Sequence, residues 1–354
     1  RAVHLLTNQR VRPEEITILG FSRRGVAEVR SRIRDGLPAT LGALDVATFH
    51  SYAARLVEAN AAAAGWSDGP QILTGPEQVA LVHRLLVNED RRDWSPAFNQ
   101  LLQTQTFARE VTDFILRSAE QLQTPQTLEA FGRDDWKGLP QFLATYNETL
   151  RGLGRIDSGT LIATAVALLE SDAPEPTAHG PAGFVLIDEY QDTTTAQVRL
   201  LQRLQSSGRH ILAAADPYQS IYSFRGATVE NVAAFETDFG SPRRPATRLL
   251  LTTSFRTPKV ILETAVGVTT GDLPGATGAV VPAAGGGSVE AYLFDQQVEE
   301  AEWIAAEAQR LHLSERVPYS KIGVFVRSKR RLLADLSRAL ERRHIPHDLP
   351  GSRL

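Results

Sequence analysis

The chain of 354 residues contains no cysteine and no methionine. Without cysteine there are no disulfides, cysteine-ligated metals or thiol redox chemistry, which fits a reducing compartment. Because translation begins with methionine, we expect Arg1 not to be the original N-terminus and the chain to be a fragment. No apolar run reaches the roughly 20 residues that span a bilayer, and the first residues do not form a signal peptide. We therefore expect a cytoplasmic protein without membrane contact.

Basic charge is also scarce, since the formal net charge is -3. The surface as a whole is therefore not positively charged, and any nucleic acid must bind in a local groove. Nearly all basic residues are arginines, whose planar guanidinium suits phosphates. The only lysines are Lys137, Lys259, Lys321 and Lys329. A glycine-rich phosphate loop of the form G-x-x-x-x-G-K-[ST] does not occur in these residues.

Short apolar runs alternate with helical stretches at the start of the chain and again after residue 182, which predicts an α/β fold with a parallel sheet. The predicted strands are residues 16–20, 45–51, 183–187, 210–215 and 248–251. With 42% hydrophobic and 22% charged residues, the composition is that of a globular protein long enough for two or more domains.

Residues 66–154 have helical periodicity only, which predicts a helical insertion into the α/β domain. One of its helices follows a capping box that begins at Thr74. The tryptophans Trp66, Trp94 and Trp136 are expected to pack in the helical core. The sheet domain is therefore split into residues 1–65 and 155–268.

Residues 269–288 are rich in glycine, alanine and proline, which is typical of a linker or loop. Residues 289–354 then read as the beginning of a second α/β domain. Its predicted strands are residues 289–294 and 321–326, and its predicted helices are residues 297–311 and 330–343.

Two adjacent carboxylates, Asp188 and Glu189, end the apolar run 184–187. Ligands of open parallel sheets bind beyond the carboxyl ends of the strands, so this pair suits a magnesium ion and a water nucleophile. In nucleotide hydrolysis, the first carboxylate can hold the metal while the second orients and deprotonates the attacking water. Alone, such a pair is more often a solvated turn, so both interpretations stay open at this point.

Residues 216–227 bring a carboxylate, an amide, aromatic rings and an arginine into one predicted loop. The loop is too polar for a core and too aromatic for an ordinary connection, whereas stacking on bases would explain its rings. A third motif, Ser254, Phe255 and Arg256, follows the strand predicted next. An arginine there can stabilise charge in phosphoryl transfer, although alone it is better explained as a surface residue at a helix start.

Taken in order, the three motifs resemble the motor core of UvrD/PcrA/Rep-type superfamily 1 helicases, which couple ATP hydrolysis to movement along single-stranded DNA. The resemblance spans nearly the whole chain. It implies a RecA-like parallel sheet with an all-helical insertion, followed by the start of a second RecA-like α/β domain. It also implies ATP and Mg²⁺ as cofactors, single-stranded DNA or DNA with single-stranded ends as the partner, and work in DNA repair or recombination.

The resemblance implies a role for each motif residue. Asp188 would hold Mg²⁺, Glu189 would act on the attacking water, and Gln219 would report on the γ-phosphate and couple it to DNA. Phe255 would stack near adenine, and Arg256 would reach the γ-phosphate across the cleft.

Contacts with DNA are implied for residues after the first two strands and in the aromatic loop. They are Phe21, Ser22, Arg23, Thr48, Phe49, His50, Tyr222, Phe224 and Arg225. The family pattern is matched loosely at Ser22 and Arg23, and Phe224 stands where many members have tryptophan. Asp157 lies in a region that is usually richer in aspartate, which puts any role for it in doubt.

Members of this family need a phosphate loop with a lysine. Aligning residues 1–6 with the helix after that loop places the lysine roughly seven residues before Arg1. We therefore expect about half of a motor, which would not hydrolyse ATP by itself. A different class remains open: a catalytically decayed member that binds DNA or pairs with an active motor. Actinobacterial helicase–nuclease heterodimers of the AdnAB type contain subunits of this kind, and the arginine-rich composition fits that context.

Overall fold

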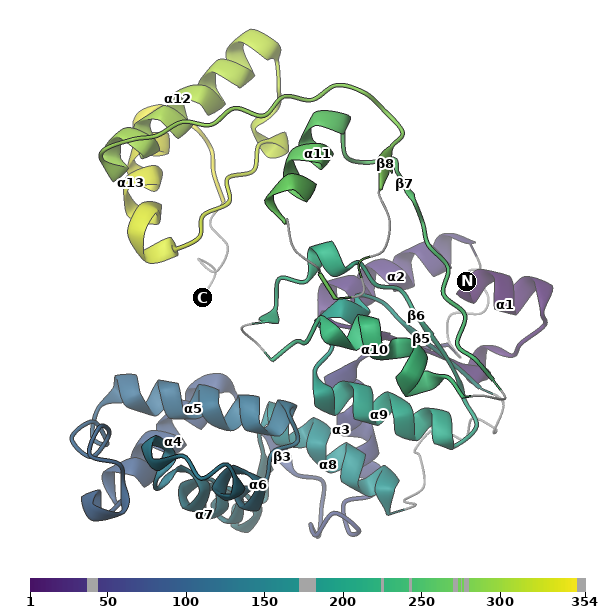
Figure 1. Cartoon of the computed structure of the whole chain (residues 1–354), viewed down its shortest axis with the longest axis vertical. Coiled ribbons are helices and arrows are strands. Elements are labelled where there is room, and N and C mark those ends of the chain that lie inside the picture. The colour runs from purple at the N-terminus through teal and green to yellow at the C-terminus, as the bar shows by residue number, and fades with distance from the viewer. Residues whose placement is uncertain are drawn as a thin grey trace. The chain divides into compact units, whose positions relative to one another are not determined.

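The computed structural model describes residues 1–36, 44–171, 183–223, 226–241, 244–269, 273–274, 276 and 280–348. These residues form two compact units (Figure 1). The first unit lies within residues 1–253 and 266–281, and the second within residues 254–265 and 282–354. Among the described residues, no helix is long and apolar enough to cross a membrane.

A four-stranded parallel sheet forms the centre of the first unit (Figure 1). Its strands are β1 (Ile16–Gly20), β2 (Asp45–Thr48), β5 (Phe184–Ile187) and β6 (His210–Ala213), in the order β2-β1-β5-β6. Ile18 of β1 lies opposite Val46 on one side and Leu186 on the other. All residues of β1 are buried, because it lies between two strands and its two faces pack against helices. The predicted α/β class with a parallel sheet is confirmed.

Helices cover both faces of this sheet, so alternate residues of one strand belong to two different cores. On one face Ile16 and Ile18 pack with α1 (Ala2–Asn8) and α2 (Arg23–Gly36). On the other face Leu19 packs with a second set of helices. They are α3 (Phe49–Ala59), α8 (Ser158–Glu170), α9 (Thr195–Ser206) and α10 (Glu230–Phe239).

A helical insertion with its own core lies between α3 and α8 in the chain (Figure 1). Its helices are α4 (Gly75–Val87), α5 (Gln105–Glu120), α6 (Pro125–Ala130) and α7 (Leu139–Gly152). Trp94 is buried in this core with its ring edge-on to Phe107 and Phe142, and Trp136 packs against the same core. Thr74 caps α4 in the predicted capping box.

Two short strands interrupt the predicted all-helical stretch. β3 (Gln71–Ile72) and β4 (Arg155–Ile156) pair in parallel where the chain enters and leaves the insertion. Strands of this length carry no periodic signal, which is why the sequence did not reveal them. Trp66 precedes β3 and packs against the core that contains α3 and α8, so its predicted place in the insertion core is wrong.

Asp157 connects the insertion with α8. This residue is 0% exposed, its Oδ1 accepts a hydrogen bond from the Thr160 amide at 2.8 Å, and its Oδ2 accepts one from the Tyr146 hydroxyl at 2.9 Å. The Tyr146 oxygen in turn accepts a hydrogen bond from Gln78 Nε2 of α4 at 3.0 Å. Asp157, whose role in the motif was in doubt, is therefore a buried structural residue that joins α7 to α8.

We expect Asp157→Ala to lower the free energy of unfolding by about 2–4 kcal/mol, because a helix cap is lost and the buried Tyr146 hydroxyl loses its acceptor. Urea unfolding measures this change. Asp113→Ala, at an exposed carboxylate of α5, is the control and should change stability by less than about 0.5 kcal/mol. Equal small changes in both variants would contradict the bridging role.

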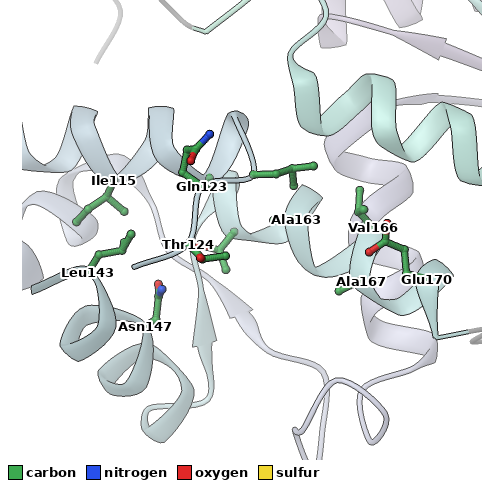
Figure 2. A pocket seen from close by; sticks show the side chains of 12 residues that line it. Ile115, Gln123, Thr124, Leu143, Asn147, Ala163, Val166, Ala167 and Glu170 are labelled. Atoms are coloured by element: carbon green, nitrogen blue, oxygen red, sulfur yellow. The ribbon is translucent and has the colours of Figure 1, made fainter. Parts of the chain in front are cut away.

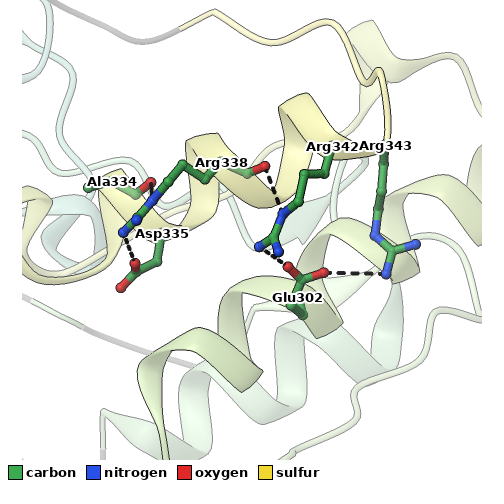
Figure 3. Close-up of polar contacts among 6 residues, drawn as sticks. All are labelled: Glu302, Ala334, Asp335, Arg338, Arg342 and Arg343. Atoms are coloured by element: carbon green, nitrogen blue, oxygen red, sulfur yellow. Dashed lines mark hydrogen bonds and ion pairs between the residues drawn. The ribbon is translucent and has the colours of Figure 1, made fainter.

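In the second unit, α12 (Gln297–Glu315) packs against α13 (Lys329–Arg342), which confirms both predicted helices. Small residues such as Ala305 on α12 let Leu336 of α13 approach closely. Figure 3 shows Glu302 of α12 accepting from both Arg342 and Arg343, which ties the two helices together. Three further elements lie before α12 in the chain, and each has residues in both units. They are β7 (Thr253–Ser254), α11 (Lys259–Val268) and β8 (Val281–Pro282), and β7 pairs with β8.

Three other predicted strands are not strands in the structure. They are residues 248–251, 289–294 and 321–326, none of which pairs with another described segment. Large apolar side chains are exposed there, including Leu251 at 92% and Phe325 at 98%. The apolar composition gives these segments a preference for extended backbone, but a strand also needs the hydrogen-bonding groups of a neighbour. Within the described ranges no neighbour provides them.

Candidate functional site

The acidic pair lies at the carboxyl end of β5, as predicted. The Asp188 amide donates to the Leu19 carbonyl at 3.1 Å, which holds the turn against β1, and both acidic side chains are exposed. Glu189 has φ +56° and ψ +46°, a left-handed conformation that costs a residue with a Cβ of the order of 1 kcal/mol. The Tyr190 amide donates to the Ala214 carbonyl at 2.9 Å, so the turn is also tied to the end of β6. A fixed, strained turn thus presents two carboxylates at the sheet edge.

Gln191 links this turn to the loop that follows β6. Its side chain is 0% exposed. The Gln191 Nε2 donates to Glu189 Oε2 at 2.6 Å, and its Oε1 accepts from the Asp216 amide at 3.0 Å. Both ends of the amide are therefore bonded, one to the acidic turn and one to the neighbouring loop.

The loop after β6 is organised around Asp216. Its Oδ1 accepts from the Tyr218 amide at 3.0 Å and caps a short 3₁₀ turn, Pro217–Gln219. Its Oδ2 accepts from Gln219 Nε2 at 2.7 Å, and Gln219 is exposed. The structure thus brings Gln219 into one hydrogen-bonded chain with Glu189, through Gln191 and Asp216.

Two aromatic residues predicted to contact DNA lie together. The ring centroids of Phe21, after β1, and Tyr222, after β6, are 4.8 Å apart with the rings tilted by 34°. Phe224 and Arg225 lie outside the described residues. The loops after β1 and β6 therefore share an aromatic contact, although β5 separates their strands in the sheet.

The other predicted DNA contacts differ in exposure. Ser22 and Arg23 are exposed at the start of α2, where Ser22 Oγ accepts from the Gly25 amide at 3.0 Å. Thr48 caps α3, since its Oγ1 accepts from the Ser51 amide.

Phe49 and His50 follow Thr48 at the start of α3, and their side chains have opposite environments. Phe49 is 2% exposed and belongs to the core beneath the sheet. Its ring is therefore unavailable to a DNA base, whereas His50 is exposed.

Phe255 and Arg256 belong to the second compact unit. Phe255 is 85% exposed, and Arg256 is exposed beside it. The Ser254 hydroxyl accepts from the Thr257 amide at 3.4 Å and shapes the turn that presents them. An exposed ring next to a guanidinium has the chemistry to stack on a base and to bind a phosphate.

The donor set at the acidic turn fits magnesium better than a metal held by protein alone. Among the described residues, no group of three or more histidine, aspartate or glutamate side chains could hold an ion. Magnesium commonly keeps several waters and takes one or two carboxylates plus substrate phosphates. Asp188, exposed at the end of β5, can supply such a carboxylate.

The family of the chain follows from comparison with known proteins. A model described as the UvrD/REP helicase N-terminal domain matches residues 1–240, more than half of the chain. The chain belongs to the UvrD/REP helicase family. The resemblance drawn from the three motifs is thereby confirmed at the level of the family.

Individual members of the UvrD/REP family are similar over much of the chain. DNA helicase II of Escherichia coli (strain K12) is 28% identical over 243 residues, covering 68% of this chain and 32% of that protein. ATP-dependent DNA helicase UvrD1 of Mycobacterium leprae is 26% identical over 371 residues, covering 99% and 45%. ATP-dependent DNA helicase PcrA of Staphylococcus epidermidis (strain RP62A) is 25% identical over 359 residues, covering 99% and 46%. The chain thus spans less than half the length of these relatives.

A buried carboxylate, Asp192, follows the acidic turn of this UvrD/REP family member. Asp192 is 4% exposed, and its Oδ1 has no hydrogen-bond partner among the described residues. Burial, and secondarily the nearby charge of Glu189, raise the pKa of Asp192 to about 6. The folded protein therefore binds this proton more tightly than the unfolded chain does, and the stability that Asp192 contributes at low pH is lost as the pH rises through about 6.

We compare the free energy of unfolding of Asp192→Asn with that of the wild type at two pH values. The difference should favour the variant by about 1–2 kcal/mol more at pH 7.5 than at pH 4.5, because asparagine has no charge to bury. Urea unfolding at both pH values measures the difference. Asp113→Asn, at an exposed carboxylate, should show no such change with pH. An Asp192→Asn effect that is the same at both pH values would contradict the raised pKa.

Gln121, at the end of α5, also contacts the aromatic loop. Its Nε2 donates to the Gly226 carbonyl at 3.1 Å, and its Oε1 accepts from the Thr195 hydroxyl of α9 at 2.7 Å. The helical insertion thus touches both the aromatic loop and the helix after the acidic turn. No sequence signal could have revealed these contacts, because Gln121 lies far from both partners along the chain and outside every motif.

A pocket of about 290 Å³ lies between α5, α7 and α8 (Figure 2). Ile115, Leu143 and Val166 contribute to a mainly apolar lining. The carboxylate in the lining, Glu170, is bound by Arg199 and Arg203. The pocket therefore offers a ligand mainly apolar contacts, and its charged group already serves to join α8 to α9.

Proposed function

We propose that this chain is part of an ATP-dependent translocase or helicase that moves along single-stranded DNA in repair or recombination. The observation that carries the proposal is the exposed pair Asp188 and Glu189 at the carboxyl edge of the sheet, hydrogen-bonded through Gln191 to the loop of Gln219. Family membership and the names of the relatives, which are ATP-dependent DNA helicases, support it. Because the chain spans less than half of these relatives, the activity is proposed for the full-length gene product.

In the proposed mechanism, Asp188 would hold the magnesium of MgATP, and Glu189 would orient the attacking water and accept its proton. The metal, when bound, neutralises phosphate charge. Glu189 is suited to this task because its backbone is fixed and its carboxylate is held by Gln191. Gln219, exposed on the adjacent loop, contacts the γ-phosphate.

Two further residues, Phe255 and Arg256, are proposed to act on the nucleotide. Arg256 stabilises the charge that develops on the transferred phosphoryl group, and Phe255 stacks on adenine. Their exposure supports both roles, since neither side chain is committed to a core.

Single-stranded DNA is proposed to pass over the loops after β1, β2 and β6. The described residues that support this path are Phe21, Ser22, Arg23, Thr48, His50 and Tyr222. The tilted pair Phe21 and Tyr222 offers ring surface for stacking on bases, and Arg23 offers charge to a phosphate. A further motor or nuclease subunit remains a proposed partner, which copurification of the native complex would reveal.

The experiment that tests this function is steady-state ATP hydrolysis by the full-length gene product with and without single-stranded DNA. A motor should be stimulated severalfold or more by DNA, and the stimulation should weaken at high salt, because phosphate contacts release counterions. DNA binding without any hydrolysis would overturn the motor assignment and favour the decayed subunit.

A further inference from the structure

Glu189 is held by a buried amide. Among the described residues, Gln191 Nε2 is the only hydrogen-bond donor to the Glu189 carboxylate, at 2.6 Å. An exposed glutamate otherwise samples several rotamers, and only some of them would point at a bound water. The position of Gln191 therefore sets the direction of the carboxylate.

Gln191 is itself fixed by the turn in which it lies. It lies in the 3₁₀ turn Tyr190–Asp192 and is 0% exposed. The Asp192 amide donates to the Glu189 carbonyl at 3.0 Å, and the Thr193 hydroxyl donates to the Tyr190 carbonyl at 2.6 Å, so the turn is closed by its own hydrogen bonds. The remaining freedom of the side chain is removed by the Asp216 amide, 3.0 Å from Gln191 Oε1.

Asp216 is the residue that also orients Gln219. Its amide bonds to Gln191, while its carboxylate bonds to Gln219 Nε2 and to the Tyr218 amide. A shift of this loop would move the acceptor end of the Gln191 amide and so redirect its donor end at Glu189. Glutamine suits this place because a neutral amide donates at one end and accepts at the other, whereas a carboxylate would repel Glu189.

We propose that Gln191 is a positioning residue that couples the orientation of Glu189 to the position of the Asp216–Gln219 loop. The inference rests on the proposed function, in which Glu189 activates water. When the loop moves, hydrolysis responds, although the buried Gln191 side chain offers no exposed surface to nucleotide or DNA. Residues of this kind commonly change activity by about 10- to 100-fold when replaced.

The test uses Gln191→Leu in the full-length gene product, which keeps the approximate shape and removes both hydrogen bonds. We expect kcat for DNA-stimulated hydrolysis to fall about 10- to 100-fold, with KM for ATP and affinity for DNA within about twofold of the wild type. Combined with Gln219→Ala, the losses should be less than multiplicative, because both variants break one chain. Full turnover in Gln191→Leu, beside a wild type that DNA stimulates, would overturn the coupling and leave the proposed function intact.

A second measurement decides the coupling without relying on turnover. The side-chain amide of Gln191 gives its own resonances in a ¹⁵N nuclear magnetic resonance spectrum. Gln219→Ala, at an exposed residue that should not impair folding, is expected to shift these resonances, and so is Glu189→Ala. Glu148→Ala, at an exposed residue of α7, should leave them in place. If Gln219→Ala also leaves them in place, the coupling is overturned, whereas a wild type without turnover but with the shift overturns only the proposed function.

Discussion

Glu189→Gln is expected to lower kcat for DNA-stimulated ATP hydrolysis by about 10²- to 10⁴-fold, the usual contribution of a general base. Glutamine keeps the size of the side chain but cannot accept the proton of the attacking water. The substitution should leave KM for ATP within a few fold, because the carboxylate acts in the transition state rather than in ground-state binding. Steady-state hydrolysis at saturating DNA gives both constants.

The matched control for this variant is Glu148→Gln, which makes the same chemical change at an exposed position of α7. Its kcat should equal that of the wild type. The midpoint temperature of thermal unfolding of Glu189→Gln should also stay within a few degrees of the wild-type value. The Glu189 side chain is exposed and contributes little to packing. A large loss of kcat in both variants would show that the effect is not specific to the acidic turn.

Arg256→Ala is expected to lower kcat by about 10³- to 10⁵-fold, the range seen when an arginine that stabilises phosphoryl transfer is removed. Arg256→Lys should recover only a small part of the lost kcat, because an ammonium lacks the planar fork that binds two oxygens at once. The same hydrolysis assay measures both variants, and single-stranded DNA binding should be unchanged in each.

Arg84→Ala is the control for this second substitution, because Arg84 is an exposed arginine of α4 outside every motif. It should hydrolyse ATP as the wild type does. If Arg256→Ala turned over at the wild-type rate, the arginine would be a surface residue at the start of a helix, which is the interpretation that its motif alone favours.

The central sheet was predictable because its strands are short apolar runs that turn residues separate from the helices. Ile16–Gly20 and Phe184–Ile187 lie close to their predicted bounds. Residues 321–326 have similar composition but no described neighbour to pair with, and pairing is a tertiary property that composition does not encode.

At the candidate site, the sequence indicated that the turns after β5 and β6 lie near each other, but not how their residues are held. The order of strands in a parallel sheet brings the turns after β5 and β6 to one edge, so the proximity of Glu189 and Gln219 was predictable. The amide of Gln191 that joins them was not, since its partner Asp216 is reached only after a helix and a strand. Phe49 could have been recognised as a core residue, because Tyr52, Ala53 and Leu56 continue its apolar helical spacing.

One assay of four reactions tests whether the Asp188–Glu189 edge is the hydrolysis site of a DNA-dependent motor. ATP turnover is measured for the full-length wild type and for Glu189→Gln, each with and without single-stranded DNA. We expect turnover that DNA stimulates in the wild type and turnover near background in Glu189→Gln under both conditions. Equal turnover in the two proteins would contradict this assignment.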